Sequence, residues 1–129
     1  MRSLLISVCL VLLPAPLGLP YVGVDDGAVP VATPKVEDAN DRARRIGREA
    51  SRAHGWTGKQ WDCLDRLIKR ESNWRPTAQN GSHYGVGQVK GMKPGTPIRK
   101  QMRIVLRYIE HRYDTPCRAL AHSLERNWY

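Results

Sequence analysis

After its first twenty residues, the 129-residue sequence has no apolar run long enough to span a membrane. It also lacks an H-E-x-x-H motif, and its four histidines show no other metal-ligand spacing, so we expect neither a metal site nor a cofactor. The glycines between Gly85 and Gly91 are spaced one residue too far apart for the dinucleotide fingerprint, and no predicted strand precedes them. The length suits a single small domain.

The first twenty residues differ from the rest of the sequence in containing a long apolar run. Arg2 precedes an apolar run from Leu4 to Leu13, which is followed by Pro14, Pro16, Gly18 and Pro20. This order predicts a secretory signal peptide over residues 1–20, although no A-x-A triplet marks its cleavage. An uncleaved anchor is the alternative. We therefore expect a secreted or cell-wall-associated protein.

The sequence contains three cysteines, and one of them lies in the predicted signal peptide. Cys9 would leave with the signal peptide, and Cys63 and Cys117 would remain. Two cysteines in an oxidising compartment favour one disulfide, and closing this loop stabilises a small domain by about 4 kcal/mol. Two separate buried thiols are the alternative. A thiol enzyme built on Cys63 and His122 is disfavoured, because Cys63 falls in the middle of a predicted helix, on its apolar side.

Basic residues outnumber acidic ones, with 21 lysines and arginines against 12 acidic residues and a formal net charge of +9. A surface of this charge attracts polyanions. Export argues against nucleic acid as the partner and favours the anionic polymers of a cell envelope.

The chain beyond residue 20 reads as a linker and one helical domain. Residues 21–36 show no period and are predicted to be an extended linker, and 37–129 form the domain. A first helix is expected over residues 37–54, ending at Gly55. Its inner face would carry a narrow stripe of small residues: Ala39, Ala43, Ile46, Ala50 and Ala53.

Three further helices are expected, which makes the fold class all-α. Thr57 to Gln60 is predicted to be a capping box, flanked by a Trp56–Trp61 hydrophobic staple, and it starts a helix that ends near Glu71. Residues 75–97 are expected to be a loop. Thr96-Pro97 and Thr115-Pro116 each predict a helix start. The apolar faces that follow would be Ile98, Met102, Val105, Leu106 and Ile109, then Cys117, Leu120, Ala121, Leu124 and Trp128.

Glu71 lies at the end of the second predicted helix. Leu64, Leu67 and Ile68 precede it by seven, four and three residues, so all four side chains share one face. Burial against apolar groups raises the pKa of a carboxyl, and the negative end of the helix dipole acts in the same direction. A carboxyl that stays protonated is what a general acid needs to cleave a glycosidic bond. An ordinary surface glutamate at a frayed helix end is the alternative.

The segment from Asn80 to Gln88, NGSHYGVGQ, combines amide, hydroxyl and aromatic groups with glycines. Such a loop can bind a sugar through hydrogen bonds around an aromatic ring, while glycines let the backbone approach the ligand. A turn-rich connector is the alternative.

Taken together, these segments resemble the soluble lytic transglycosylase-like domains, which share the goose-type lysozyme fold. The similarity covers about residues 40–129 and is closest to the small secreted forms of actinobacteria and their phages. Its spacing is more specific than any single motif. The residues that match the family patterns are Ala53, Gly55, Trp56, Gln60, Trp61, Cys63, Leu64, Leu67, Arg70, Glu71, Ser72, Asn73, Trp74, Pro76, Ala78, Asn80, Tyr84 to Gln88, Tyr108, Ile109, Arg112, Tyr113, Thr115, Pro116, Cys117, Ala119, Trp128 and Tyr129.

The resemblance implies an exported enzyme that cuts the MurNAc–GlcNAc backbone of peptidoglycan. Glu71 would protonate the leaving oxygen and then deprotonate the 6-hydroxyl of the sugar, which closes a 1,6-anhydro ring without water. The implied substrate-binding residues are Ser72, Asn80, Tyr84, Gly85, Gln88 and Tyr108. We expect a monomer that needs no cofactor. This chain departs from the family in two places. The Asn80–Tyr84 loop is shorter than usual and has His83 where the family often has alanine, and the stretch between Gln88 and Ile98 is also shorter. We therefore expect reduced activity or a narrower cleft.

Two other functions remain open at this point. A lysozyme-like hydrolase would need a second carboxyl, and the candidates are Asp62, Asp65, Glu110 and Asp114, for which we expect surface roles. A non-catalytic wall-binding protein would keep the fold and act through the basic helix at residues 42–52.

Overall fold

The computed structural model describes Gly18 and residues 35–129. The predicted signal peptide (1–20) therefore lies outside the described residues except for Gly18. The predicted linker (21–36) also lies outside them, except for Lys35 and Val36.

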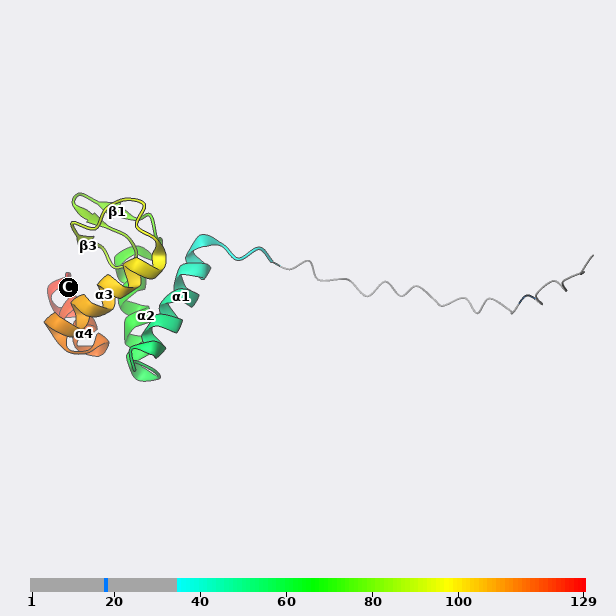
Figure 1. The fold of residues 1–129 in the computed structure, drawn as a ribbon. Helices are drawn as coiled ribbons and strands as arrows, with labels where there is room; N and C mark the ends of the chain where they lie inside the picture. Colours follow the sequence, from blue (N-terminus) through cyan, green and yellow to red (C-terminus); the bar gives the residue numbers. More distant parts are fainter. Residues whose placement is uncertain (1–17, 19–34) are drawn as a thin grey trace, which may run out of the picture. The chain divides into compact units, whose positions relative to one another are not determined.

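Helices make up most of the described region (Figure 1). They are α1 (Ala39–Ala53), α2 (Lys59–Ser72), α3 (Ile98–Tyr113) and α4 (Pro116–Arg126). Between α2 and α3 lie β1 (Gln79–Asn80), β2 (His83–Tyr84) and β3 (Val89–Lys90), which pair in an antiparallel sheet of order β1-β2-β3. The mostly helical class is confirmed, but the prediction missed the sheet, because strands of two residues are too short to show an alternating pattern.

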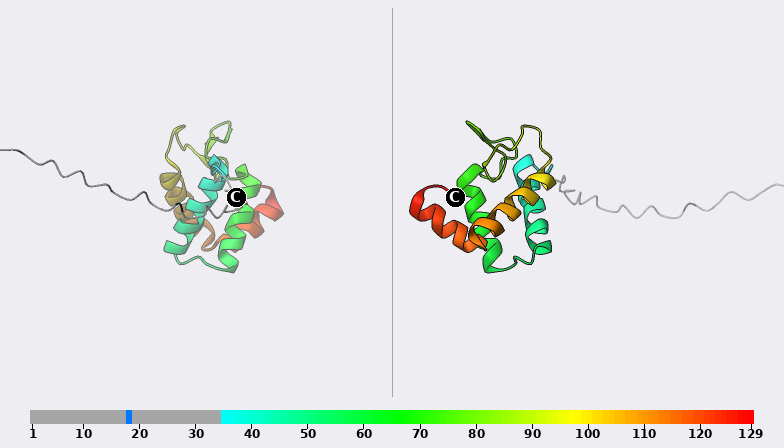
Figure 2. Two further views of the ribbon diagram at one scale, coloured as in Figure 1. Left: turned by 90° about the vertical axis from the view of Figure 1, so that its right-hand side faces the viewer. Right: turned by 60° about the vertical axis from the view of Figure 1, so that its left-hand side comes forward.

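The helices enclose one apolar core. Helix α2 packs against α4, and α1 packs against α3. On α2, Leu64, Leu67 and Ile68 are fully buried, and each such side chain contributes about 1.5–3 kcal/mol of hydrophobic free energy. Both views in Figure 2 place the sheet and its loops at one end of these helices. Within the described part of the chain, no helix has both the length and the apolar character to cross a membrane.

The predicted capping box at the start of α2 is wrong. The N-cap residue is Gly58, with φ 50°, and no side chain caps the helix there. The amide oxygen of Gln60 instead accepts a hydrogen bond of 3.1 Å from the backbone N–H of Cys117, at the start of α4. Gln60 therefore fixes two helices against each other. At the end of α1, Gly55 follows the C-cap with φ 86°, as predicted.

The two threonine-proline pairs behave differently. Thr115 caps α4 by accepting a hydrogen bond from the N–H of Arg118, and Pro116 is the first helical residue, as predicted. Thr96 does not cap α3: its hydroxyl donates to the carbonyl of Lys93, and Pro97 itself is the N-cap. Along α4 the predicted apolar face is also wrong in part, since Leu124 and Trp128 are each 50% exposed and the buried residues are Pro116, Ala119, Leu120 and Ser123.

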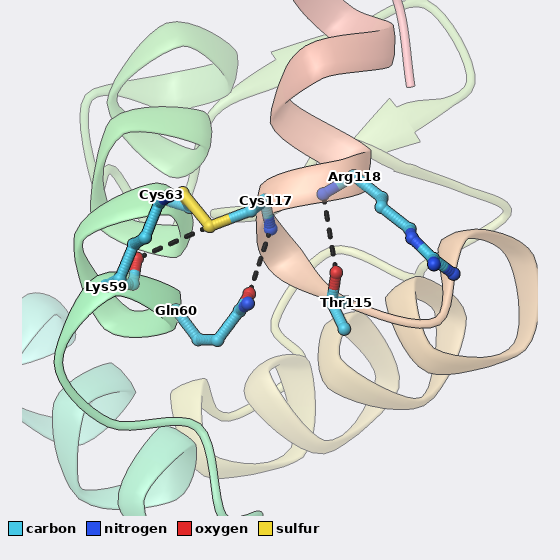
Figure 3. Close-up of a disulfide and its surroundings, with 6 residues drawn as sticks. All are labelled: Lys59, Gln60, Cys63, Thr115, Cys117 and Arg118. Carbon is cyan, nitrogen blue, oxygen red and sulfur yellow. Dashed lines mark hydrogen bonds between the residues drawn. A yellow bond between two sulfur atoms is a disulfide. The ribbon is translucent and has the colours of Figure 1, made fainter.

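The predicted disulfide between Cys63 and Cys117 is confirmed (Figure 3). It links the middle of α2 to the first turn of α4 and closes a loop with a sequence separation of 54 residues. Because both sulfurs are bonded to each other, neither is available as a thiolate nucleophile. The Cys63–His122 thiol enzyme is thereby excluded for the oxidised protein.

The expected surface role of Asp65 is wrong. We expected a surface role, yet this residue is buried between α1, α2 and the segment that follows α2. Its carboxylate accepts hydrogen bonds from Arg44 Nε at 2.7 Å and Trp74 Nε1 at 2.8 Å, and it pairs with Lys69 Nζ at 2.9 Å. Burial raises the pKa of Asp65, but these three donors outweigh it and lower the pKa to about 2. The carboxylate therefore acts as a structural link.

Candidate active site

Glu71 occupies the last turn of α2, one residue before the helix ends. The helix stops because Asn73 takes a left-handed conformation at the C-cap, with φ 53°, and Trp74 follows with φ 61°. These two residues turn the chain sharply away from the helix axis. Glu71 lies on the side of α2 that buries Leu67 and Ile68, and its own side chain is half-buried. The predicted placement of Glu71 on this face is confirmed.

The surroundings of Glu71 favour its neutral form. Burial raises the pKa of the carboxyl above its ordinary value, and the positive charges of Arg70 and His83 act in the opposite direction and only partly offset it. The predicted direction of the pKa shift is confirmed. Within residues 35–129, no hydrogen bond or ion pair to another side chain contributes to this shift. Burial is thus the main influence on the pKa of this carboxyl.

The loop beside Glu71 is fastened to α2 and α3 by buried polar groups. Ser72 donates a hydrogen bond of 2.6 Å from its hydroxyl to the carbonyl of Val86. The side chain of Gln101, only 1% exposed, accepts from Val86 N–H at 2.9 Å. It also donates to the carbonyls of Pro76 and Thr96, at 2.9 and 2.8 Å. Gln101 was missed by sequence reasoning, because a glutamine on a helix carries no signal that it will be buried.

Two glycines of the loop are required by close packing. Gly85 has φ 83°, and a Cβ there would clash with the Gln101 side chain. A Cβ at Gly87 would clash with Val105 and with the hydroxyl of Tyr129. Glycine is therefore needed here to bring the loop against α3 and the end of the chain.

A cleft with a volume of about 490 Å³ opens next to Glu71. The end of α2, the sheet and the last three residues of the chain form its walls. Among the predicted site residues, Glu71, Asn80 and Gln88 line it. The Gln88 amide nitrogen donates to the carbonyls of Ala78 and Gly85, at 3.0 and 2.9 Å, which orients its side chain. The complete lining is Arg70, Glu71, Arg75, Ala78, Gln79, Asn80, His83, Gln88, Asn127, Trp128 and Tyr129.

Four other predicted site residues lie near the cleft without lining it. Ser72 is buried and is fully engaged with the loop backbone. Tyr84 is 7% exposed, and its hydroxyl accepts a hydrogen bond of 3.2 Å from the N–H of Gly95. Gly85 contributes backbone to the loop, and Tyr108 packs edge-on against Tyr129 with ring centroids 5.6 Å apart. The structure thus gives these four residues a supporting place, and ligand contact stays a prediction for Asn80 and Gln88.

Trp128 and Tyr129 also belong to the site, which the sequence did not predict. Both residues match the end of the sequence pattern shared with the transglycosylase-like domains. The Tyr129 hydroxyl donates a hydrogen bond of 2.7 Å to the carbonyl of Gly87. Burial, and then the nearby charge of Glu71, raises the pKa of Tyr129 well above its ordinary value, so the hydroxyl stays protonated. Trp128 presents an exposed ring to the cleft, with Arg112 stacked on it at 5.5 Å.

The other candidate acids do not line this cleft. Asp62, Glu110 and Asp114 are exposed, as expected, and none of them lines it. Among the described residues, Glu71 is the only side-chain carboxyl of the cleft. The same part of the chain contains no group of three histidine, cysteine or acidic side chains arranged to hold a metal ion.

Comparison of this chain with protein-family models, with curated proteins and with solved structures finds no match.

Proposed function

We propose that this protein is an exported, lysozyme-like enzyme that cleaves the MurNAc–GlcNAc backbone of peptidoglycan without water. The observation that carries the proposal is the Glu71 carboxyl, half-buried at the wall of a cleft, with a raised pKa and no side-chain partner among the described residues. Residues 40–129 resemble the soluble lytic transglycosylase-like domains, which share the goose-type lysozyme fold. This resemblance supports the same function.

The surroundings of Glu71 suit a glycan. Asn80 and Gln88 supply amides that can bind sugar hydroxyls, and the exposed face of Trp128 can stack on a sugar ring. Tyr129 and the loop glycines hold the backbone of residues 85–88 in place behind them. These groups come from three separate segments, which suits a chain of sugars lying across the cleft.

The proposed chemistry needs a single carboxyl. Protonated Glu71 donates its proton to the glycosidic oxygen as the bond to the muramyl carbon breaks, and positive charge develops on that sugar ring. The resulting Glu71 carboxylate then takes the proton of the sugar's 6-hydroxyl, whose oxygen bonds to the same carbon. The product carries a 1,6-anhydro ring, and Glu71 is protonated again. A two-carboxylate hydrolase is less favoured, because no second side-chain carboxyl of the described residues lines the cleft.

The protein incubated with purified peptidoglycan sacculi tests this proposal. The wild-type protein is expected to release soluble muropeptides, and Glu71→Gln is expected to release none, because an amide is too weak an acid to transfer a proton to the glycosidic oxygen. Asp62→Asn is a matched control, since Asp62 is an exposed acid on the same helix and lies outside the cleft. Equal release by Glu71→Gln and the wild type would overturn the proposal.

The wall-binding alternative is weakened by what the basic helix contacts. Arg44 is paired with Asp65, and Arg45 is paired with Glu37 and Glu49. Two of the five arginines at residues 42–52 are therefore paired within the protein, so the charge free to attract a polyanion is smaller than the sequence suggests.

A further inference from the structure

The cleft beside Glu71 carries more positive than negative side-chain charge. Among the described residues, Arg70, Arg75 and His83 line it together with a single side-chain carboxyl, that of Glu71. When Glu71 is protonated, as its proposed role as an acid requires, the two arginines remain charged. A neutral stretch of sugar has no negative charge to pair with these two arginines.

The two arginines are oriented by groups that do not cancel their charge. Arg75 Nε donates to the carbonyl of Ser72 at 3.1 Å. Arg70 donates from Nε and Nη2 to the hydroxyl and carbonyl of Ser123, both at 3.4 Å. Within residues 35–129, neither guanidinium pairs with a carboxylate, whereas Arg44 and Arg45 on α1 both do.

We propose that Arg75, with Arg70 and His83, forms an anion subsite that binds a free carboxylate carried by the muramyl unit of the glycan. This subsite rests on the proposed function and specifies its substrate. A guanidinium presents parallel N–H groups that match the two oxygens of a carboxylate, and the remaining N–H groups of Arg75 have no protein acceptor among the described residues. The carboxylate belongs either to the lactyl ether of a peptide-free muramic acid or to the stem peptide of a substituted one.

Binding to the Glu71→Gln variant of the full chain tests the subsite, because this background cannot consume the glycan. Three probes are compared: peptide-free glycan strands with free lactyl carboxylates, the same strands with those carboxylates converted to methylamides, and strands that keep their stem peptides. We expect the methylamide strands to bind about tenfold more weakly than the carboxylate strands at low salt. The expected difference shrinks as salt screens the charge. Peptide-bearing strands that bind more tightly than both peptide-free probes would assign the anion to the stem peptide.

Arg75→Gln, added to this background, is expected to remove the preference for the carboxylate strands and leave the methylamide strands unchanged. Arg75 is the better position to change, since Arg70 also ties α2 to α4 through Ser123. Arg66→Gln is the matched control, because Arg66 is an exposed arginine of α2 outside the cleft, and it should keep the preference. Thermal melting of each variant establishes that it is folded.

The outcomes separate the subsite from the proposed function. Equal binding of all three probes, or binding of none, would overturn the subsite even if the wild type cleaves sacculi. A preference for carboxylate over methylamide strands that disappears in Arg75→Gln would support the subsite. This holds even if the wild type releases no muropeptides, and in that case only the proposed cleavage would fail.

Discussion

Ser72 joins the helix that carries Glu71 to the loop that faces it, through a hydrogen bond of 2.6 Å to the carbonyl of Val86. The serine is adjacent to Glu71 in sequence and is buried. Any movement of the loop away from α2 must break this bond. The width of the cleft beside Glu71 is therefore set in part by one buried hydroxyl.

Ser72→Ala is expected to lower the free energy of unfolding by about 1–3 kcal/mol, because the buried Val86 carbonyl loses its side-chain donor. Release of muropeptides should fall more than stability alone explains, since the loop would no longer be held against α2. Urea unfolding and sacculus digestion measure the two effects. Ser82→Ala, at an exposed position of the same loop, should change neither. Unchanged stability in Ser72→Ala would show that the bond does not fasten the loop.

Glu71→Gln should stabilise the protein at neutral pH while abolishing activity. The folded state raises the pKa of this carboxyl above the ordinary value of 4.5, so it binds this proton more tightly than the unfolded chain does. The corresponding stabilisation is complete below that ordinary value and is lost as pH rises through the folded pKa. Glutamine mimics the neutral form at every pH.

The melting temperature of Glu71→Gln should therefore exceed that of the wild type at about pH 7 and match it at about pH 3. Glu125→Gln, at an exposed glutamate of α4, serves as the control and should show no such pH-dependent gain. A Glu71→Gln protein that is less stable than the wild type at neutral pH would contradict the inference that burial dominates at this site.

Asp65→Asn should show the opposite dependence on pH. The pKa of Asp65 is lowered from 3.8 to about 2 in the folded state, because its pairing with Arg44, Lys69 and Trp74 outweighs burial. The stabilisation is present above the ordinary value and is lost as pH falls through the folded pKa. It amounts to about 2 kcal/mol at neutral pH.

Urea unfolding at about pH 7 should thus show Asp65→Asn to be less stable than the wild type by about this amount, with the difference shrinking towards pH 2. The exposed Asp62→Asn provides the comparison at neutral pH and is expected to be nearly neutral. A loss that is the same at both pH values would indicate that packing, and not charge, is what Asp65 contributes.

Removing the disulfide should destabilise the protein strongly. With a separation of 54 residues between Cys63 and Cys117, the chain-entropy model gives about 4 kcal/mol. The Cys63→Ser, Cys117→Ser double variant, compared with the oxidised wild type by urea unfolding, should show a loss of this size. If the reduced wild type were as stable as the oxidised form, the disulfide would not be the link between α2 and α4 that we describe.

The sequence predicts the helices well where a pattern repeats over several turns. The Leu64-Leu67-Ile68 face of α2 is predicted in this way, and the Thr115 cap is predicted from the threonine-proline pair that starts α4. The sequence fails where a polar side chain has two partners to choose from. Gln60 was expected to cap its own helix but accepts from Cys117, a residue 57 positions away, and no local pattern reports that contact.

The residues of the candidate site also differ in whether a local sequence pattern predicts them. Glu71 is evident from its position on an apolar face, and its raised pKa follows from that position. Gln101 and Asp65 are not evident, because burial of a polar side chain depends on partners from other elements. The small sheet also escapes prediction, since its strands are defined by pairing across a loop and not by their own composition.

Mass analysis of the glycan ends released from sacculi tests the central claim most directly. We predict that the wild-type protein releases muropeptides whose muramyl ends are one water lighter than reducing ends, as a 1,6-anhydro ring requires, and that Glu71→Gln releases none. Reducing ends alone would make the protein a hydrolase. Identical release by Glu71→Gln would contradict the assignment of Glu71 as the catalytic acid.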